Sequence, residues 1–366
     1  MSAVERKFAD AWQAKLMLRK SENSLRSLSL HDNGVDFFSN DYLGLAQSSN
    51  IVHESIQGST GSRLISGNSS FHERLETEIA NYFGSESALL YNSGYDANLG
   101  LLSCIADRAD TIIYDEHVHA SMRDGLRLSQ SRSFSFHHND IEHLEAKLKA
   151  ASGKVFVAIE GIYSMTGDQP PLLAVYKLCQ EYEAYLIVDE AHSLGFYKKG
   201  LCHDVGIDPG QVIRIITFGK AMGYHGAAVL TNNVLKQYLI NFSRSLIYTT
   251  AMPTSSVQAL SKLIEVYDKA DNARKNLKRN IAAFKKLYDQ TAHNGQSIGP
   301  VQMVYSKSRE TLHALQSHLI SEGMLVKSIF HPTVPKNSEG IRLCIHSFNT
   351  TQQIEALCHS LNTFKH

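Results

Sequence analysis

The sequence has little of several features that mark whole classes of protein. Its 36 Lys and Arg residues balance its 36 Asp and Glu residues, so it lacks the charge excess typical of nucleic-acid or anionic-membrane partners. No stretch approaches about 18 consecutive apolar residues, which excludes a membrane-spanning helix. The five cysteines include no CxxC pair, so we expect reduced thiols and a cytoplasmic location. The N-terminal residues mix charged and apolar side chains, and we expect no signal peptide there.

The length and the order of the apolar segments predict two domains. A chain of 366 residues is long enough for one large α/β domain and a smaller one. From residue 85 to residue 230 a strand, loop and helix pattern repeats, which indicates a mostly parallel sheet with right-handed crossovers. We expect an N-terminal helix and arm at residues 1–45, with a basic amphipathic helix and a short connection over residues 1 to about 30. A large α/β domain is expected at 46–252, followed by a connecting helix from about 253 to 292 that opens a small α+β domain at 253–366.

Two predicted strands end in side chains that suit one cofactor. An apolar, β-branched run, VIRII, ends at Thr217 and is soon followed by Lys220. A second run, AYLIV, ends in Asp189, with His192 close behind. The carboxyl ends of parallel strands meet at one edge of a sheet, where open α/β folds bind their ligands. An amine that forms an imine with an aldehyde, a carboxylate that keeps a pyridine nitrogen protonated and an imidazole that bonds a phenolic oxygen suit pyridoxal 5'-phosphate.

The same residues have other interpretations. A lone lysine is usually a solvated surface charge, and an aspartate at a strand end often only starts a loop. The run LIVDEAH is also typical of DEAH-box helicases, whose Asp binds magnesium. That interpretation requires an upstream phosphate loop that ends in Gly-Lys followed by Ser or Thr. The one candidate, Gly219 with Lys220, lies downstream and is followed by Ala221, which disfavours a helicase.

A tight turn at Ser93, Gly94 and Tyr95 joins a predicted strand to a predicted helix. The start of a helix presents unpaired amides and the positive end of its dipole, and both favour a phosphate group. We expect the cofactor phosphate to lie there, with the Thr217 hydroxyl as a second donor. The glycines at 58, 61 and 67 would let the backbone approach a ligand closely, although this composition also fits a flexible loop.

Further polar residues follow, or interrupt, predicted strands. His117 and His119 have no third ligand at a characteristic spacing, so we expect no metal site there. We expect His119 to lie as an aromatic plate over the pyridine ring, with a surface or helix-capping position as the alternative. Glu160 and Ser164 follow a buried strand at the same ligand edge. Arg342 lies inside an apolar strand, where it either grips a substrate carboxylate through two parallel hydrogen bonds or forms an internal ion pair.

Short motifs spread over nearly the whole chain carry a resemblance to a known family. They are, in order, SNDYLGL, GSTGSRLISGN, SGYDAN, HASMRDG, EGIYSMTGD, DEAHSLG, TFGKAMG, IYTTAMP and HPTVP. As a set they resemble the α-oxoamine synthases, which are pyridoxal-phosphate enzymes of fold type I. The resemblance implies an aspartate aminotransferase-like α/β fold, in which a large domain with a mostly parallel seven-stranded sheet is followed by a small C-terminal α+β domain.

The resemblance implies a role for each matching residue. Lys220 matches the lysine that binds the cofactor covalently, and Asp189 matches the partner of the pyridine nitrogen. His192 matches the residue at the ring oxygen and His119 the one stacked on the ring, so these four are the implied catalytic residues. The implied cofactor contacts are Ser93, Gly94, Tyr95, His119, Glu160, Ser164, Asp189, His192, Thr217, Lys220 and Thr250, the implied substrate contacts are Asn40, Ser62, Ser164 and Arg342, and no metal is implied. Thr250 matches a residue that reaches the phosphate from the other subunit, which implies a homodimer with shared sites.

The reaction that the resemblance implies is a decarboxylative condensation. L-alanine would react with a pimeloyl thioester of coenzyme A or a carrier protein, releasing carbon dioxide and the thiol, in biotin biosynthesis. The freed Lys220 amine would remove the α-proton of alanine, for which its pKa must fall from about 10.4 through burial and the nearby cationic ring. Ser62 stands where relatives that accept glycine tend to carry Thr, and its smaller side chain leaves space for the methyl group of alanine.

Two groups of alternatives remain open at this point. Sister enzymes of the same family, such as serine palmitoyltransferases, 2-amino-3-ketobutyrate ligases and aminolevulinate synthases, share the motifs and differ in their substrates. A non-catalytic partner subunit would keep the fold and lose the chemistry. Such a chain is expected to lack the cofactor lysine, whereas this one carries Lys220, Asp189 and His192 together.

Overall fold

The computed structural model of the chain describes residues 17, 20–23, 34–45, 58–288, 297–306 and 308–364. The amphipathic helix and short connection expected over residues 1 to about 30 lie outside these residues, apart from 17 and 20–23. Among the helices in the described part of the chain, none is long and apolar enough to cross a membrane. The five cysteines all fall within it, and none forms a disulfide.

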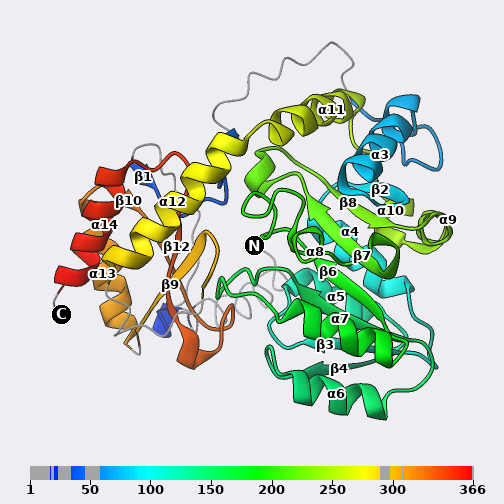
Figure 1. The fold of residues 1–366 in the computed structure, drawn as a ribbon, viewed down its shortest axis with the longest axis horizontal. Coiled ribbons are helices and arrows are strands. Elements are labelled where there is room, and N and C mark those ends of the chain that lie inside the picture. The colour runs from blue at the N-terminus through cyan, green and yellow to red at the C-terminus, as the bar shows by residue number, and fades with distance from the viewer. Residues whose placement is uncertain are drawn as a thin grey trace, which may run out of the picture.

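A seven-stranded sheet forms the centre of the larger part of the molecule (Figure 1). Its strands are β2 (Ser87–Tyr91), β3 (Thr111–Asp115), β4 (Arg132–Phe136), β5 (Val155–Glu160), β6 (Tyr185–Asp189), β7 (Val212–Thr217) and β8 (Ala227–Thr231). The spatial order is β2-β8-β7-β6-β5-β3-β4. Only β8 runs antiparallel to its neighbours. The predicted mostly parallel α/β sheet is therefore confirmed.

Both faces of this sheet are covered, as expected for parallel strands that read as continuous apolar runs. Side chains of β5 alternate between two cores: Phe156 and Ala158 pack on one side, and Val157 and Ile159 on the other. The first core includes helices α4 (Gly94–Cys104), α5 (Ala120–Leu128), α9 (Asn233–Phe242) and α10 (Arg244–Ile247). The second includes α6 (Ile141–Ala150), α7 (Leu172–Glu181) and α8 (Leu201–Asp204). The strand ends that carry the predicted site thus belong to a sheet that is buried on both faces.

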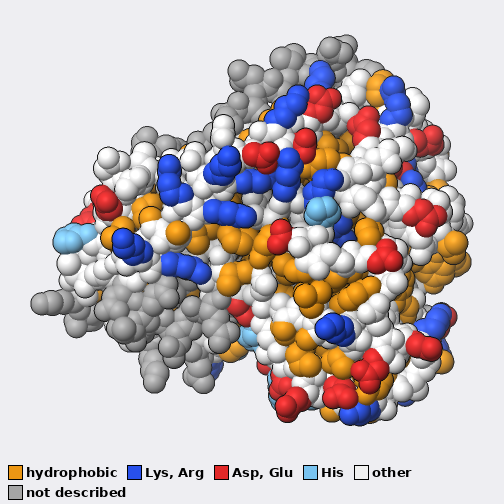
Figure 2. Space-filling model, in the orientation of Figure 1, with side chains coloured by type: hydrophobic (Ala, Val, Ile, Leu, Met, Phe, Trp, Pro, Cys, Tyr) orange, Lys and Arg blue, Asp and Glu red, His pale blue; other side chains and the backbone are white. Residues whose placement is uncertain are grey.

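The helical stretch expected from about 253 to 292 as one connecting helix is two helices. They are α11 (Thr254–Asp268) and α12 (Asp271–Leu287), and they pack on different neighbours. Helix α11 lies against α3 (Ser70–Phe83), while α12 lies against α14 (Thr351–Thr363). The apolar face of α12 includes Leu277, Ile281 and Phe284, whereas Lys and Arg side chains gather over its outer face (Figure 2). The chain therefore forms two helices, because each one buries its apolar face against a different neighbour.

The C-terminal part is a small α+β unit, as the sequence predicts. Its antiparallel sheet has the order β11-β12-β9, formed by β9 (Val301–Tyr305), β11 (Lys327–Ile329) and β12 (Gly340–Cys344), with α13 (Arg309–Ser321) packed on it. Strand β10 (Met324–Leu325) instead pairs with β1 (Val35–Asp36) near the N-terminus. The carbonyl of Phe37 also accepts a 2.7 Å hydrogen bond from the amide of Cys344. These contacts bring the SNDYLGL segment beside β12. The described part of the chain also contains the short 3-10 helices η1 (Pro209–Gln211), η2 (Lys220–Met222) and η4 (Lys336–Ser338).

Candidate active site

Lys220 lies just beyond β7, at the first residue of η2. Its backbone has φ of +49°, in the left-handed region that a residue other than glycine enters only at a cost. Such strain persists where the surrounding structure fixes a functional side chain. Burial lowers the pKa of the Lys220 amine to about 8, against the opposing charges of Asp189 and Glu160. The lowered pKa expected from the sequence is present, and burial is its main cause.

Asp189 and Glu160 end neighbouring strands and are directly paired across β6 and β5. The carboxylate of Asp189 accepts hydrogen bonds from the Asn98 side-chain amide at 2.6 Å and from the Ala191 backbone at 2.9 Å. Glu160 accepts one from the Ser164 amide at 3.1 Å, and its buried Oε1 has no partner among the described residues. Burial, with the charge of Asp189, raises the pKa of Glu160 to about 8. Two carboxyl groups thus lie at the strand edge beside Lys220.

His119 caps the N-terminus of α5. Its Nδ1 accepts a hydrogen bond from the Ser121 amide at 3.2 Å and lies 2.8 Å from the Ser121 hydroxyl. Burial lowers the pKa of the ring. Because Nδ1 is an acceptor, the proton of the neutral ring lies on Nε2. The Ser121 hydroxyl also accepts from Asn98 at 3.0 Å, so hydrogen bonds run from His119 through Ser121 and Asn98 to Asp189.

His192 follows Asp189 by three residues and is buried, with its Nδ1 2.7 Å from the Tyr42 hydroxyl. Burial, with the positive charges of Lys220 and Arg342, lowers the pKa of His192 well below its usual value, so the ring is neutral. Its Nε2 forms no hydrogen bond with the described residues. A neutral imidazole with one nitrogen engaged by a hydroxyl can bond a ring oxygen through the other.

The residues at the start of α4 fit a phosphate group. The Ser93 hydroxyl caps the helix by accepting from the Asp96 amide at 3.0 Å. A Cβ on Gly94 would lie 2.6 Å from the Thr217 methyl group, so only glycine fits there. The Thr217 hydroxyl is buried and has no hydrogen-bond partner within the described part of the chain. An unpartnered donor beside free helix amides suits an anion. Tyr95 is 43% exposed and contacts Asp124 through its hydroxyl.

Arg342 reaches the site from β12 and is buried. Its guanidinium donates to the Ser164 carbonyl at 2.8 Å, the Asn40 side-chain oxygen at 3.0 Å and the Cys344 sulfur at 3.1 Å. No described carboxylate forms an ion pair with it. The internal ion pair considered from the sequence is therefore wrong for the described residues. The structure brings Asn40, Ser164 and Arg342 together with an unneutralised charge.

Ser62 and Thr250 lie on two other loops, near the turn that begins at Ser93. The carbonyl of Gly61 accepts from the Ala251 amide at 2.9 Å, which joins the two loops. The carbonyl of Thr250 accepts from the Asn92 side chain at 2.9 Å. Among the described contacts, neither Ser62 nor Thr250 is hydrogen-bonded to Lys220, Asp189 or His192 of the same chain.

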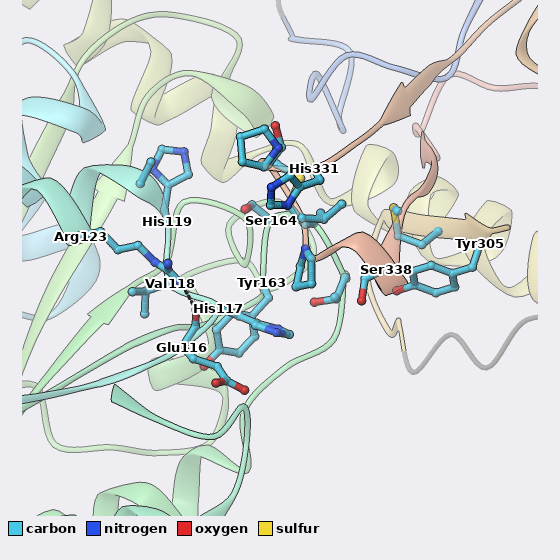
Figure 3. Close-up of a pocket in the computed structure, with 18 residues that line it drawn as sticks. Glu116, His117, Val118, His119, Arg123, Tyr163, Ser164, Tyr305, His331 and Ser338 are labelled. Carbon is cyan, nitrogen blue, oxygen red and sulfur yellow. Dashed lines mark hydrogen bonds between the residues drawn. The ribbon is translucent and has the colours of Figure 1, made fainter. Parts of the chain in front are cut away.

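A cavity of about 590 Å³ is lined by two of the predicted site residues, His119 and Ser164. It lies between the two parts of the molecule, with His119, Tyr163 and Ser164 toward one side and Tyr305, His331 and Ser338 toward the other (Figure 3). Its lining also includes the side chains of Met165, Met303 and Val334. This mixture of apolar walls and a few polar groups is typical of a small-molecule site.

Four residues at this site were not singled out from the sequence: Tyr42, Asn98, Ser121 and Cys344. Asn98 lies four residues after Gly94, one helical turn further along the same face of α4. That spacing was the available signal for it. Tyr42 lies two residues after Asn40 and bonds its side-chain oxygen at 3.0 Å. No signal in the sequence separates Cys344 from a core cysteine.

The comparisons with known proteins agree with this geometry. The family described as aminotransferase class I and II matches residues 32–361. An 8-amino-7-oxononanoate synthase of Emericella nidulans is 35% identical, covering 95% of this chain and 94% of its own. One from Lysinibacillus sphaericus is 32% identical, covering 94% of this chain and 95% of its own. The structure of such a synthase from Francisella tularensis is 28% identical with a TM-score of 0.79, covering 90% of this chain and 97% of that one. A serine palmitoyltransferase variant from S. paucimobilis, solved with a bound PLP-myriocin aldimine, has a TM-score of 0.88 at 22% identity, covering 99% of this chain and 98% of that one.

The fold and the site together define a pyridoxal-phosphate-dependent enzyme of fold type I. The chain belongs to the class I and II aminotransferase family, and its resemblance to the α-oxoamine synthases is confirmed. It is an acyltransferase that uses pyridoxal 5'-phosphate as its cofactor.

Proposed function

We propose that the enzyme condenses L-alanine with a pimeloyl thioester to give 8-amino-7-oxononanoate, carbon dioxide and the free thiol, in biotin biosynthesis. The new bond joins the α-carbon of alanine to the thioester carbonyl carbon, and the carboxyl group of alanine leaves as carbon dioxide. The relatives from Emericella nidulans and Lysinibacillus sphaericus are named 8-amino-7-oxononanoate synthases, and this chain matches them over nearly their whole length.

One observation carries this proposal: the buried guanidinium of Arg342 faces the site without a described acidic partner. An α-amino acid brings the carboxylate that would complete it, and arginine binds a carboxylate through two parallel hydrogen bonds. Asn40 and the Ser164 carbonyl hold the guanidinium in place from two other segments. The amino acid would therefore lie between Arg342 and the amine of Lys220.

The chain's own residues then divide the remaining work. When bound, pyridoxal phosphate supplies an aldehyde for the amino group and a ring that accepts the electrons of the broken bond. Asp189 would hold the positive charge at the ring nitrogen, and Asn98 orients Asp189. The Lys220 amine, with its pKa of about 8, can accept the α-proton near neutral pH and return one later. His119 would lie over the ring and offer its Nε2 proton toward the substrate.

Ser93, Gly94, Tyr95 and Thr217 would hold the phosphate, and His192 the ring oxygen. Glu160 and Ser164 would complete the cofactor side of the site. We place Ser62 and Thr250 near a subunit boundary, because Thr250 is exposed and the family resemblance implies that it reaches the phosphate of the other subunit. The working unit would then be a cytoplasmic homodimer. The domains would be residues 1–45, 46–252 and 253–366.

A second α-oxoamine synthase activity is the main competitor, because the fold also matches serine palmitoyltransferase with a TM-score of 0.88. An assay of thiol release separates the two. Glycine, alanine and serine are each combined with acetyl, succinyl, pimeloyl and palmitoyl thioesters. We expect the highest kcat/KM with L-alanine and the pimeloyl thioester. Turnover only with serine and the palmitoyl thioester, or only with glycine, would contradict this assignment and identify the enzyme as another α-oxoamine synthase.

A further inference from the structure

His138 lies two residues beyond β4, in a segment to which the sequence assigns no function. Its Nδ1 is 2.9 Å from a carboxylate oxygen of Asp115, and its Nε2 is 2.7 Å from one of Asp168. Both carboxylates are buried. An imidazole that faces carboxylates through both nitrogens donates from both, and it therefore carries a positive charge. Because this charged ring lies between two carboxylates, we call His138, Asp115 and Asp168 together an ionic clamp. Among the described residues, no group of His, Cys, Asp and Glu side chains is arranged to hold a metal ion.

One end of this clamp holds the segment that carries His119. Asp115 ends β3, and its carboxylate also accepts from the His117 amide at 2.7 Å and the Asn139 amide at 2.9 Å. His117 follows two residues later and His119 four residues later. The position of the ring proposed to cover the cofactor therefore depends on Asp115.

The other end holds the loop after β5. The Asp168 backbone carbonyl accepts from the Tyr163 amide at 2.9 Å, which closes the loop on itself. Within this loop lies Ser164, whose carbonyl accepts from Arg342 at 2.8 Å. His138 thus joins the cofactor-side segment to the substrate-side loop.

The rings packed around His138 also line the cavity. The ring of His117 stacks on that of His138 with the ring centroids 3.9 Å apart, and the ring of Tyr163 meets it edge-on with the centroids 4.4 Å apart. Both His117 and Tyr163 line the 590 Å³ cavity (Figure 3). Glu116 accepts from the His138 backbone amide at 3.2 Å. The charged and titratable groups that face His138 are therefore Asp115, Asp168, Glu116, His117 and Tyr163.

We propose that His138 is a positioning residue, whose bonds to Asp115 and Asp168 fix one wall of the cavity and thereby govern binding of the acyl thioester. The proposal rests on the proposed function for the identity of that thioester. The amino acid is less affected, because Arg342 has two acceptors outside this loop, Asn40 and Cys344, beside the Ser164 carbonyl within it.

The clamp stabilises the structure only over the range of pH in which His138 is charged. Burial alone would lower the pKa of His138, but the hydrogen bonds and charges of Asp115 and Asp168 raise it to about 9. Burial, with the charge of His138, lowers the pKa of His117, which therefore stays neutral. Since the folded pKa of His138 lies above its usual 6.5, the stabilisation is complete below pH 6.5 and is lost as the pH rises through about 9.

The test compares His138→Gln with His137→Gln in the cofactor-loaded protein. His137 is the adjacent histidine, is 68% exposed and does not line the cavity. In His138→Gln we expect KM for the acyl thioester to rise about tenfold, the value of one charge-assisted hydrogen bond, with a smaller change in KM for alanine. His137→Gln should match the wild type. Equal thioester KM values in the two variants would overturn the proposal.

A second measurement needs neither substrate nor variant. Amide exchange protection of residues 163–168 in the wild type, corrected for intrinsic rates, should fall as the pH rises through about 9, together with the NMR titration of His138. Protection that is flat from pH 7 to 10, or a His138 titration near 6.5, would refute the clamp. These readouts stay decisive if the pimeloyl thioester proves not to be the substrate, so the two proposals fail separately.

Discussion

The side-chain amide of Asn98 donates a hydrogen bond to the carboxylate of Asp189 over 2.6 Å, and both residues are buried. The second proton of the same amide goes to the Ser121 hydroxyl, 3.0 Å away. One side chain thus links the carboxylate proposed for the ring nitrogen to the histidine proposed for the ring face.

This link predicts that Asn98→Ala weakens cofactor binding without removing any direct cofactor contact. A hydrogen bond to a charged group is worth about 1.5–3 kcal/mol, so the Kd for pyridoxal phosphate should rise about tenfold to a hundredfold. Titration of the cofactor-free protein by absorbance measures it. Asn241→Ala, at an exposed position in α9, is the matched control and should bind as the wild type does. An unchanged Kd in Asn98→Ala would contradict this role.

Arg342→Lys should lose affinity for the amino acid while keeping the positive charge. Lysine cannot reproduce the planar pair of donors, so we expect KM for L-alanine to rise about tenfold or more. The visible spectrum of the bound cofactor should stay as in the wild type. The control is Arg127→Lys, on the outer face of α5, where the side chain is 77% exposed. Should KM for alanine stay the same in Arg342→Lys, the carboxylate is bound elsewhere.

The lowered pKa of Lys220 predicts how cofactor capture depends on pH. Only the neutral amine attacks the aldehyde, and with a pKa of about 8 about one tenth of it is neutral at pH 7. The rate of cofactor association with the cofactor-free protein should therefore rise through pH 8 and level off above it. Stopped-flow absorbance follows the reaction. The reference is Nα-acetyl-lysine, whose side-chain amine has an ordinary pKa. A rate that keeps climbing to pH 10 and beyond would show an ordinary lysine.

Gly94→Ala should weaken phosphate binding because its Cβ would lie 2.6 Å from the Thr217 methyl group. Overpacking costs about 1–3 kcal/mol, so cofactor affinity should fall about fivefold to a hundredfold. Thr217→Ser keeps the hydroxyl and removes the methyl group, so it should bind the cofactor nearly normally. The double variant should recover much of the loss. If Thr217→Ser gives no recovery, the effect of Gly94→Ala has another origin.

The strand-end residues of the site could be predicted from the sequence for a simple physical reason. An apolar, β-branched run that ends at or just before a charged residue marks both a buried strand and its ligand edge, as at Glu160, Asp189 and Lys220. Asn98 and Ser121 lie on helices, where a polar residue can face the sheet or the solvent. The rotation of α4 and α5 on the sheet decides between these, and that depends on packing across the whole layer.

The boundary between α11 and α12 shows the same limit in the fold. Lys269 and Ala270 separate the two helices, and neither residue type stops a helix by itself. The break follows from the two different surfaces that α11 and α12 cover. Likewise, Met324–Leu325 and Lys327–Ile329 form two short strands, β10 and β11, because each pairs with a different strand.

The central claim is that Lys220 binds pyridoxal phosphate covalently beside Asp189. Borohydride reduction of the loaded protein followed by peptide mass spectrometry tests it most directly, with Lys220→Ala and Lys262→Ala as the variant and its matched control. The account predicts one phosphopyridoxyl group on the peptide that contains Lys220, present in Lys262→Ala and absent in Lys220→Ala. A label on any other lysine, or an unlabelled wild type after incubation with the cofactor, would contradict it.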